Sequence, residues 1–299
     1  MNLLINMFRM MTFFLLINNA HAAQQNSHIV NTKLQAIEKQ SHLKIGLYAL
    51  DTNSGQIITH HANDRFPFQS TFKLIGVSAL LTQDSSKHPL QKKVFLHPRD
   101  LVFWHPVSGQ YVNQYVTLQI LAQATISYSD NPAINIIIHE LGGLKAVNQF
   151  AHQMGNTSFN LAHYEAQLNS NPHDIADTST PKDMALSIQK ILLSTVLSSE
   201  NKSLLLSWMK DNTAGYHRIR AGVPLGWLVA DKTGSGSYGI ANDIGIAWSP
   251  TCKPVVLSIF TVSEEPHAKP NDAVIAKVTQ ILFEEFEQHH ACYKATRLI

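Results

Sequence analysis

The sequence has few cysteines, no long apolar segment and no cluster of basic residues. Only Cys252 and Cys292 occur among 299 residues, which excludes a small domain held together by a framework of disulfides. No apolar run reaches the length of a membrane-spanning helix. Lys and Arg are scattered and the formal net charge is only +2, so we expect neither a nucleic-acid partner nor a membrane-surface partner.

Motifs for metals and nucleotides are missing as well. The chain contains no HExxH and no CxxC. Its histidines include two adjacent pairs, at 60–61 and 289–290, and adjacent residues do not share a helix face, so we expect solvated histidines. The run 234–239 has the form GxGxxG, but a strand pattern follows it instead of a helix, which indicates a hairpin turn. The sequence therefore predicts no metal and no other cofactor.

The first 22 residues have the features of a secretory signal. Arg9 and the amino terminus supply positive charge, residues 10–17 form a short apolar stretch, and Ala20-His21-Ala22 offers small residues for cleavage. We therefore expect a periplasmic or secreted protein whose mature chain begins near Ala23.

The order of secondary-structure patterns predicts one sheet built from both ends of the chain. A hairpin pattern covers residues 43–59, helical patterns fill the middle, and strand patterns follow at 227–232, 244–248 and 255–262 before a last helix from Asn271. The helical patterns cover 71–83, a segment from Pro132 to Gly142-Gly143, and about 117–126, 182–196 and 201–211. We expect an α/β (α+β) fold with a five-stranded antiparallel sheet, residues 23–62 plus 212–299, and an inserted all-helical domain, residues 63–211.

A serine and a lysine lie one helical turn apart at Ser70-Thr71-Phe72-Lys73. A serine hydroxyl is a weak nucleophile until a base removes its proton, and a desolvated lysine at this spacing can act as that base. The pattern SxxK alone is weak, because the chain contains five further copies, starting at Ser41, Ser179, Ser187, Ser199 and Ser207.

Three other short motifs distinguish Ser70 from these copies. Ser129-Asp130-Asn131 precedes the Pro132 helix, Glu165 to Asn169 lies in a polar irregular stretch, and Lys232-Thr233-Gly234 lies on a predicted strand. Each motif occurs once, and glycine in the last one would let a ligand approach the strand edge. Chance does not readily explain the occurrence of all four motifs in this order.

With these motifs the chain resembles the class A serine β-lactamases, whose characteristic set is SxxK, SDN and KTG. The resemblance covers nearly the whole mature chain and extends to the segments 212–215, 217–221 and 239–243. It implies a sheet domain and a helical domain with the active site in the crevice between them. It also implies a hydrolase that opens the ring of β-lactam antibiotics.

The resemblance implies roles for five reacting or water-holding residues. Ser70 would attack the lactam carbonyl, and either Lys73 or Glu165 would be the base for acylation. Glu165 together with Asn169 would hold the water that hydrolyses the acyl-enzyme. Ser129 would pass a proton to the departing lactam nitrogen.

The resemblance also implies a set of substrate contacts. Asn131 would contact the amide side chain of the substrate, and Lys232 with Arg220 would face its carboxylate. The backbone N–H groups of Ser70 and Ser235 would form the oxyanion hole. The full substrate-binding set is Trp104 at the mouth, Asn131, Asn169, Arg220, Lys232, Thr233, Gly234 and Ser235.

Two features depart from the common family pattern. His163 stands where many relatives have an arginine that pairs with an aspartate, here Asp177, and a histidine pair weakens when the ring loses its proton. We therefore expect a more mobile loop than an arginine would give. The family's disulfide within the helical domain is absent. Cys252 and Cys292 could form a disulfide in an oxidising compartment, and the alternative is two free thiols.

Two alternative functions share parts of this motif set. A D-Ala-D-Ala peptidase or penicillin-binding protein also has the serine, SxN and KTG elements, but it lacks a positioned deacylating base. A penicillin-sensing module would need a transmembrane segment and a signalling domain. Glu165 and Asn169 favour the lactamase, which we expect to be a monomer with a β-lactam as its small-molecule partner.

Overall fold

The computed structural model describes residues 29–87, 89–249, 251–289 and 291–294. The predicted secretory signal, residues 1–22, lies outside this part of the chain. A helix over residues 29–41 is the first element described, and it leads directly into the sheet.

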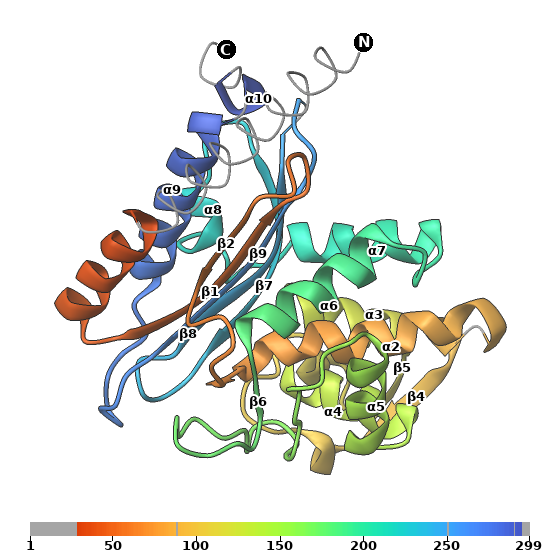
Figure 1. The fold of residues 1–299 in the computed structure, drawn as a ribbon. Helices are drawn as coiled ribbons and strands as arrows, with labels where there is room; N and C mark the ends of the chain where they lie inside the picture. Colours follow the sequence, from red (N-terminus) through yellow and green to blue (C-terminus); the bar gives the residue numbers. More distant parts are fainter. Residues whose placement is uncertain (1–28, 88, 250, 290, 295–299) are drawn as a thin grey trace, which may run out of the picture.

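One five-stranded sheet, with strand order β2-β1-β9-β8-β7, forms the centre of the fold (Figure 1). Every neighbouring pair is antiparallel, and β1 pairs with β9 over eight positions, so the two ends of the chain meet in the middle of the sheet. This confirms the predicted sheet. Its strands are β1 (Lys44–Asp51), β2 (Ile57–His60), β7 (Leu228–Ser235), β8 (Ala241–Trp248) and β9 (Val255–Val262).

Each face of the sheet is covered by helices (Figure 1). The helix over residues 29–41, α8 (Ile219–Gly222) and α9 (Asp272–His289) cover one face, and the larger group of helices covers the other. Strand β9 contributes to both cores, because Leu257 and Ile259 enter one hydrophobic cluster while Val256 and Phe260 enter the other. The period of two along a strand thus accounts for a strand that is apolar at nearly every position.

The larger group of helices is built around α2 (Phe72–Lys87). It also contains α3 (Leu118–Ser127), α4 (Asn131–Leu141), α5 (Leu144–Gln153), α6 (Pro181–Leu193) and α7 (Ser199–Lys210). Short elements connect them: η1 (Gln69–Thr71), β3 (Phe66–Pro67), η2 (Pro89–Gln91), β4 (Lys93–Leu96), η3 (Pro98–Asp100), η4 (Ser108–Tyr111), β5 (Gln114–Thr117) and β6 (Thr178–Ser179). The domain boundaries at residues 62 and 212 stay a prediction.

The helix after the SDN motif has the predicted start and stop. The Asp130 side chain accepts a hydrogen bond from the Ala133 N–H, and Pro132 occupies the first turn, where its missing N–H costs nothing. Gly142 ends the helix with a φ of 101°, a left-handed conformation that glycine adopts without a steric penalty.

The two cysteines are joined. Cys252, in the turn before β9, and Cys292, in α10 (Ala291–Lys294), have Cα atoms 5.5 Å apart and form a disulfide. Helix α9 follows β9 and leads to α10, which returns Cys292 to the start of the strand. The bridge fits an oxidising compartment.

One of the predicted solvated histidines is buried. His60, at the end of β2, is only 6% exposed, while the side chain of the neighbouring His61 is 41% exposed. The prediction was wrong for His60, because the helix over residues 29–41 places Asn31 and Glu38 against its ring. The side chains of His289 and His290 lie outside the described part of the chain.

Candidate active site

A cleft of about 600 Å³ lies where the start of α2 meets the edge strand β7. Its walls come from the α2 start, the loops around residues 104 and 129, the loop over residues 160–177, and β7. Eight of the predicted residues line it: Ser70, Trp104, Ser129, Asn131, Glu165, Thr233, Gly234 and Ser235. Lys73 and Lys232 are fully buried beneath its floor.

Ser70 lies in η1, immediately before α2, and is packed closely against β7. A Cβ atom on Gly234 would lie 3.1 Å from the Ser70 backbone nitrogen and 2.9 Å from the carbonyl oxygen of Phe68. On the next strand, the Asn242 amide donates hydrogen bonds to the carbonyls of Pro67 and Phe68. Glycine is therefore required at 234 so that the serine backbone can approach the strand.

The Lys73 amine is the centre of a hydrogen-bond network. Nζ lies 3.0 Å from Ser70 Oγ, 2.9 Å from Glu165 Oε1 and 2.5 Å from Asn131 Oδ1, and it also donates to the Ser129 carbonyl at 2.8 Å. Burial lowers the pKa of Lys73, although the charges of Glu165 and Asp130 oppose this shift. A buried amine with a lowered pKa can accept a proton from its neighbour.

The Glu165 carboxylate points at the nucleophile. The Ser70 hydroxyl donates a hydrogen bond to Glu165 Oε1 at 3.2 Å. Asn135, on α4, makes two hydrogen bonds with the backbone of Glu165. Its Nδ2 donates to the Glu165 carbonyl, and its Oδ1 accepts from the Glu165 N–H. The peptide bond from Glu165 to Ala166 is cis. Asn135 thus positions the carboxylate, a role not predicted from the sequence.

The Ser129 hydroxyl lies between two amines. Its Oγ is 3.3 Å from Lys73 Nζ and 3.1 Å from Lys232 Nζ. Burial and the neighbouring Lys73 lower the pKa of Lys232 to about 7, against the opposing charges of nearby carboxylates. The hydroxyl can therefore exchange a proton with either lysine.

The aspartate of the SDN motif, Asp130, holds a loop beside the cleft through hydrogen bonds. Asp130 is fully buried, and its carboxylate accepts hydrogen bonds from the N–H groups of Val107 and Ser108 and from the Ser108 hydroxyl. These bonds tie the loop around residue 104 to the start of α4. Asp130 is thus a positioning residue for Ser129 and Asn131.

Two arginines behind the end of β7 make different contacts. Neither Arg218 nor Arg220 lines the cleft, and the guanidinium of Arg220 donates to Asp231 at 2.7 Å and to the Met209 carbonyl. Arg218 instead donates from Nη2 to the Ser235 hydroxyl at 2.6 Å. The two side chains diverge because Arg218 precedes α8 while Arg220 lies within it. Arg218 thus supplies the cation beside Ser235, and the substrate-binding role of Arg220 stays a prediction.

The Asn169 side chain makes hydrogen bonds within its own loop, and its water-holding role stays a prediction. Its side-chain amide donates to the carbonyls of Asn171 and Ala176, and its Oδ1 accepts from the Asn171 N–H. Among the described residues, no hydrogen bond joins this side chain to Glu165. The local turn uses the amide, since Asn side chains readily bond to backbone two residues ahead. Asn169 therefore shapes the loop in this structure.

The predicted pair that closes the loop is formed. His163 Nδ1 lies 2.7 Å from Asp177 Oδ2. Asp177 is fully buried, and its carboxylate also accepts from the N–H groups of Ala162, His163 and Asn169. One carboxylate thus joins both ends of the loop. The greater mobility expected of this loop stays a prediction.

Trp104 and Asn131 form one rim of the cleft. Trp104 is 53% exposed, and its Nε1 donates to the Tyr128 carbonyl. Asn131 Nδ2 donates to the Phe103 carbonyl, and the Asn131 N–H donates to the Trp104 carbonyl. The exposed ring offers an apolar surface for a substrate side chain at the mouth.

Comparison with known proteins gives consistent similarities. A family model described as the beta-lactamase enzyme family matches residues 29–286, which include every residue of the cleft. Beta-lactamase 3 of Bacillus cereus is 45% identical over 255 residues, which are 85% of this chain and 80% of that protein. The carbapenem-hydrolyzing beta-lactamase KPC of Klebsiella oxytoca is 36% identical, over 86% of this chain and 89% of that protein. The crystal structure of a class A beta-lactamase from Clostridium kluyveri matches with a TM-score of 0.83 and 36% identity, over 86% of this chain and 98% of the other.

Proposed function

Because the chain belongs to the class A β-lactamase family, we propose that Ser70 opens the lactam ring of penicillin-type antibiotics and that water activated by Glu165 releases the product. The chain is a β-lactam hydrolase, an activity that confers resistance to these antibiotics. The observation that carries the proposed residue roles is the contact of Glu165 Oε1 with both Ser70 Oγ and Lys73 Nζ.

Acylation begins with attack by the hydroxyl. Ser70 Oγ attacks the lactam carbonyl while its proton passes to Glu165 or to Lys73, both of which lie within hydrogen-bond distance. The N–H groups of Ser70 and Ser235 stabilise the oxyanion that forms on the carbonyl oxygen. The ring C–N bond then breaks, and the Ser129 hydroxyl donates a proton to the departing nitrogen. Lys73 and Lys232 replace that proton, since both amines contact Ser129 Oγ.

Deacylation requires a base on the side of the ester where water enters. The Glu165 carboxylate is held by Asn135 and faces Ser70, so it can remove a proton from a water molecule beside the ester. Attack by this water breaks the bond to Ser70 Oγ, which recovers its proton. A penicillin-binding protein has no base at this position and stops at the acyl-enzyme.

The substrate carboxylate binds at the end of β7. Thr233 and Ser235 offer hydroxyl groups, Lys232 lies below the cleft floor, and Arg218 reaches Ser235 from behind the strand. Two cations at this end of the cleft favour substrates that carry a carboxylate next to the lactam ring. In this proposal Arg218 takes the role predicted for Arg220.

We also propose that the protein is exported and acts as a monomer. Within the described residues, no helix combines the length and apolarity needed to cross a membrane. The Cys252–Cys292 disulfide fits an oxidising compartment, as does the signal pattern over residues 1–22. Amino-terminal sequencing of the purified periplasmic or secreted protein should begin near Ala23.

Steady-state kinetics with two substrates test this function. A chromogenic penicillin or cephalosporin should be turned over many times per enzyme molecule, while a D-Ala-D-Ala peptide should not be cleaved. The Ser70→Ala variant should bind the lactam but release no product. Release of one equivalent of chromophore, followed by no turnover in the native enzyme, would support a penicillin-binding protein instead.

A further inference from the structure

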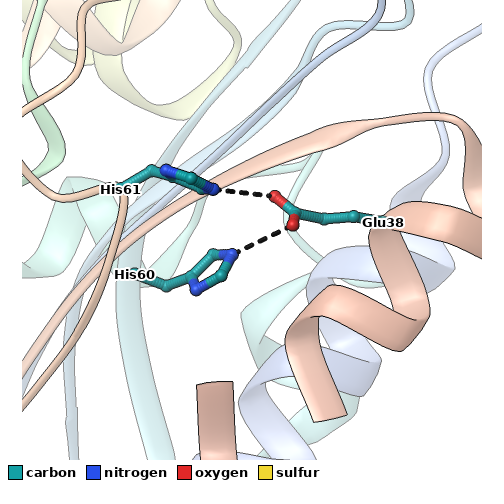
Figure 2. A group of neighbouring side chains, drawn as sticks. All are labelled: Glu38, His60 and His61. Atoms are coloured by element: carbon teal, nitrogen blue, oxygen red, sulfur yellow. Dashed lines mark ion pairs between the residues drawn. The ribbon is translucent and has the colours of Figure 1, made fainter. Parts of the chain in front are cut away.

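Three potential metal ligands converge at the edge of the sheet that lies opposite the cleft. Glu38 comes from the helix over residues 29–41, His60 ends β2, and His61 follows it (Figure 2). One ligand atom from each of the three lies within 4.8 Å of the others. Strand β2 is one edge of the sheet and β7 is the other, so this group is separate from the active site. We refer to Glu38, His60 and His61 as the edge cluster.

The separations within the edge cluster match those of ligands around one small ion. His60 Nε2 lies 3.1 Å from Glu38 Oε2, and His61 Nε2 lies 3.6 Å from Glu38 Oε1. Ligands at zinc distances of about 2.0–2.2 Å in a tetrahedral site are about 3.3 Å apart. The three side chains could therefore bind an ion with only small rotations.

An uncommon backbone conformation brings both imidazoles to one carboxylate. Successive side chains of a strand point to opposite faces, so adjacent histidines would normally diverge. His61 has a φ of 44°, in the left-handed region that residues other than glycine seldom adopt. This conformation ends the strand alternation, and in Figure 2 both rings face Glu38.

In each imidazole, Nδ1 lies close to a side-chain oxygen of a neighbouring residue. His60 Nδ1 is 2.9 Å from Asn31 Oδ1, and His61 Nδ1 is 3.4 Å from Asp64 Oδ2. An oxygen at Nδ1 favours the tautomer that carries its proton there, which leaves the Nε2 lone pair free for a metal. Glu38 is oriented as well, because its Oε1 accepts the Ile45 N–H at 2.8 Å. These are the supporting contacts that surround metal ligands in proteins.

The buried Nε2 of His60 lies close to the Glu38 carboxylate but outside the geometry of a well-formed hydrogen bond. His60 is 6% exposed, and within the described residues its Nε2 has no hydrogen-bond partner, although a carboxylate oxygen lies 3.1 Å away. A nitrogen that is close to an oxygen but not aligned with it is expected when both are directed at a common third atom. A cavity of about 730 Å³ is lined by His60, His61 and Asp64, which gives an ion and a water molecule access.

We propose that the edge cluster binds one divalent zinc ion through His60 Nε2, His61 Nε2 and the Glu38 carboxylate, with water as the fourth ligand. Two imidazoles and one carboxylate suit zinc in a tetrahedral site. The ion would fix the helix over residues 29–41 to the end of β2, so its role is structural. Because binding occurs only in the folded chain, zinc raises the stability of the native protein.

Calorimetric titration of the metal-free protein with zinc tests this proposal. The native protein should bind one equivalent, and its melting temperature should rise by several degrees. His61→Asn changes a side chain that is 41% exposed, so the variant should fold, and its zinc Kd should increase at least about tenfold. It should also hydrolyse lactams at the native rate, because His61 does not line the cleft.

His173→Asn is the matched control. His173 pairs with Glu264 at 2.8 Å on the surface, so the His173→Asn substitution also removes a histidine–glutamate contact. This variant should bind zinc as the native protein does. Cobalt(II) provides a second readout, because four-coordinate cobalt absorbs strongly in the visible range and the His61→Asn complex should lose those bands. The proposal is wrong if the native protein shows no saturable zinc site, or if His61→Asn and His173→Asn bind zinc equally.

Discussion

The contact between Gly234 and the backbone of Ser70 can be tested by adding one methyl group. In a Gly234→Ala variant the new Cβ would lie 2.9 Å from the Phe68 carbonyl oxygen, 3.0 Å from Gln69 Cβ and 3.1 Å from the Ser70 nitrogen. Ordinary contacts between such atoms begin near 3.4–3.5 Å, so the strand and the serine backbone must separate by about half an ångström. Two of these neighbours are backbone atoms, which cannot turn aside as a side chain can.

This displacement has two expected costs. Forcing a methyl group into a packed contact lowers the free energy of unfolding by about 1–3 kcal/mol. The separation also moves the Ser70 N–H relative to that of Ser235, and loss of one oxyanion-hole donor costs about 10²–10³ in kcat. Because the donor is moved and not removed, we expect kcat/KM to fall about 10–100-fold, equivalent to about 1.4–2.7 kcal/mol.

The assay compares two alanine variants of the same strand edge. In Gly236→Ala the added atom would meet only side-chain atoms, Gln69 Cδ at 2.8 Å and Ser170 Oγ at 3.0 Å, and these can rotate away. Initial rates with a chromogenic penicillin should therefore fall much less for Gly236→Ala than for Gly234→Ala. Turnover of Gly234→Ala within twofold of the native enzyme would refute the claim that this contact positions the oxyanion hole.

Three further predictions concern charged groups, and the first of them compares two arginines. Arg218→Gln should raise KM for lactams about tenfold or more, since a charged hydrogen-bond donor contributes about 1.5–3 kcal/mol, and it should also destabilise the fold, because the buried Arg218 pairs with Asp272. Arg220→Gln should destabilise the fold by about 3–5 kcal/mol, because it leaves the buried Asp231 without its cation partner. Lys232, whose pKa is lowered to about 7, is protonated below that pH and neutral above it, so kcat/KM should fall as the pH rises through about 7. A Lys232→Arg variant should lose this pH dependence, and so should the native enzyme with a substrate whose carboxylate is esterified. His163→Arg should raise the melting temperature, because arginine keeps its charge beside Asp177; equal stability and turnover in the two proteins would argue against a mobile loop.

Most of the sheet could be predicted from the sequence, because its strands are long and strongly patterned. The strand at Val255–Val262 has the predicted bounds, and the Pro132–Gly142 helix has the predicted first-turn proline and glycine stop. Helix α5 was missed although its apolar residues Leu144, Val147, Phe150 and Ala151 lie at helical spacing. The short strands β3 to β6 have two to four residues each, too few for a period to be recognised.

Within the site, the motifs identified the reacting groups but not the direction of every side chain. Ser70 and Lys73 meet Glu165 as predicted, because the first two lie in η1 and α2 and Asn135 holds the backbone of Glu165. Arg218 and Arg220 are separated by a single residue, and only the start of α8 decides which one contacts Ser235.

The buried histidine was missed for a similar reason. Adjacent histidines diverge on a regular strand, and the residue types near His60 do not predict the left-handed conformation of His61. Asn135 was missed because one asparagine within an apolar helix gives no signal that it holds the backbone of a distant loop.

The central claim is that Glu165 activates the water that cleaves the ester at Ser70. Its most direct test is the intact mass of a Glu165→Ala variant mixed with a penicillin. We predict that the variant forms a stable adduct of one penicillin per chain and releases product only in an initial burst, while the native enzyme shows no adduct and Ser70→Ala never forms one. Steady turnover by Glu165→Ala without an accumulated adduct would contradict the account.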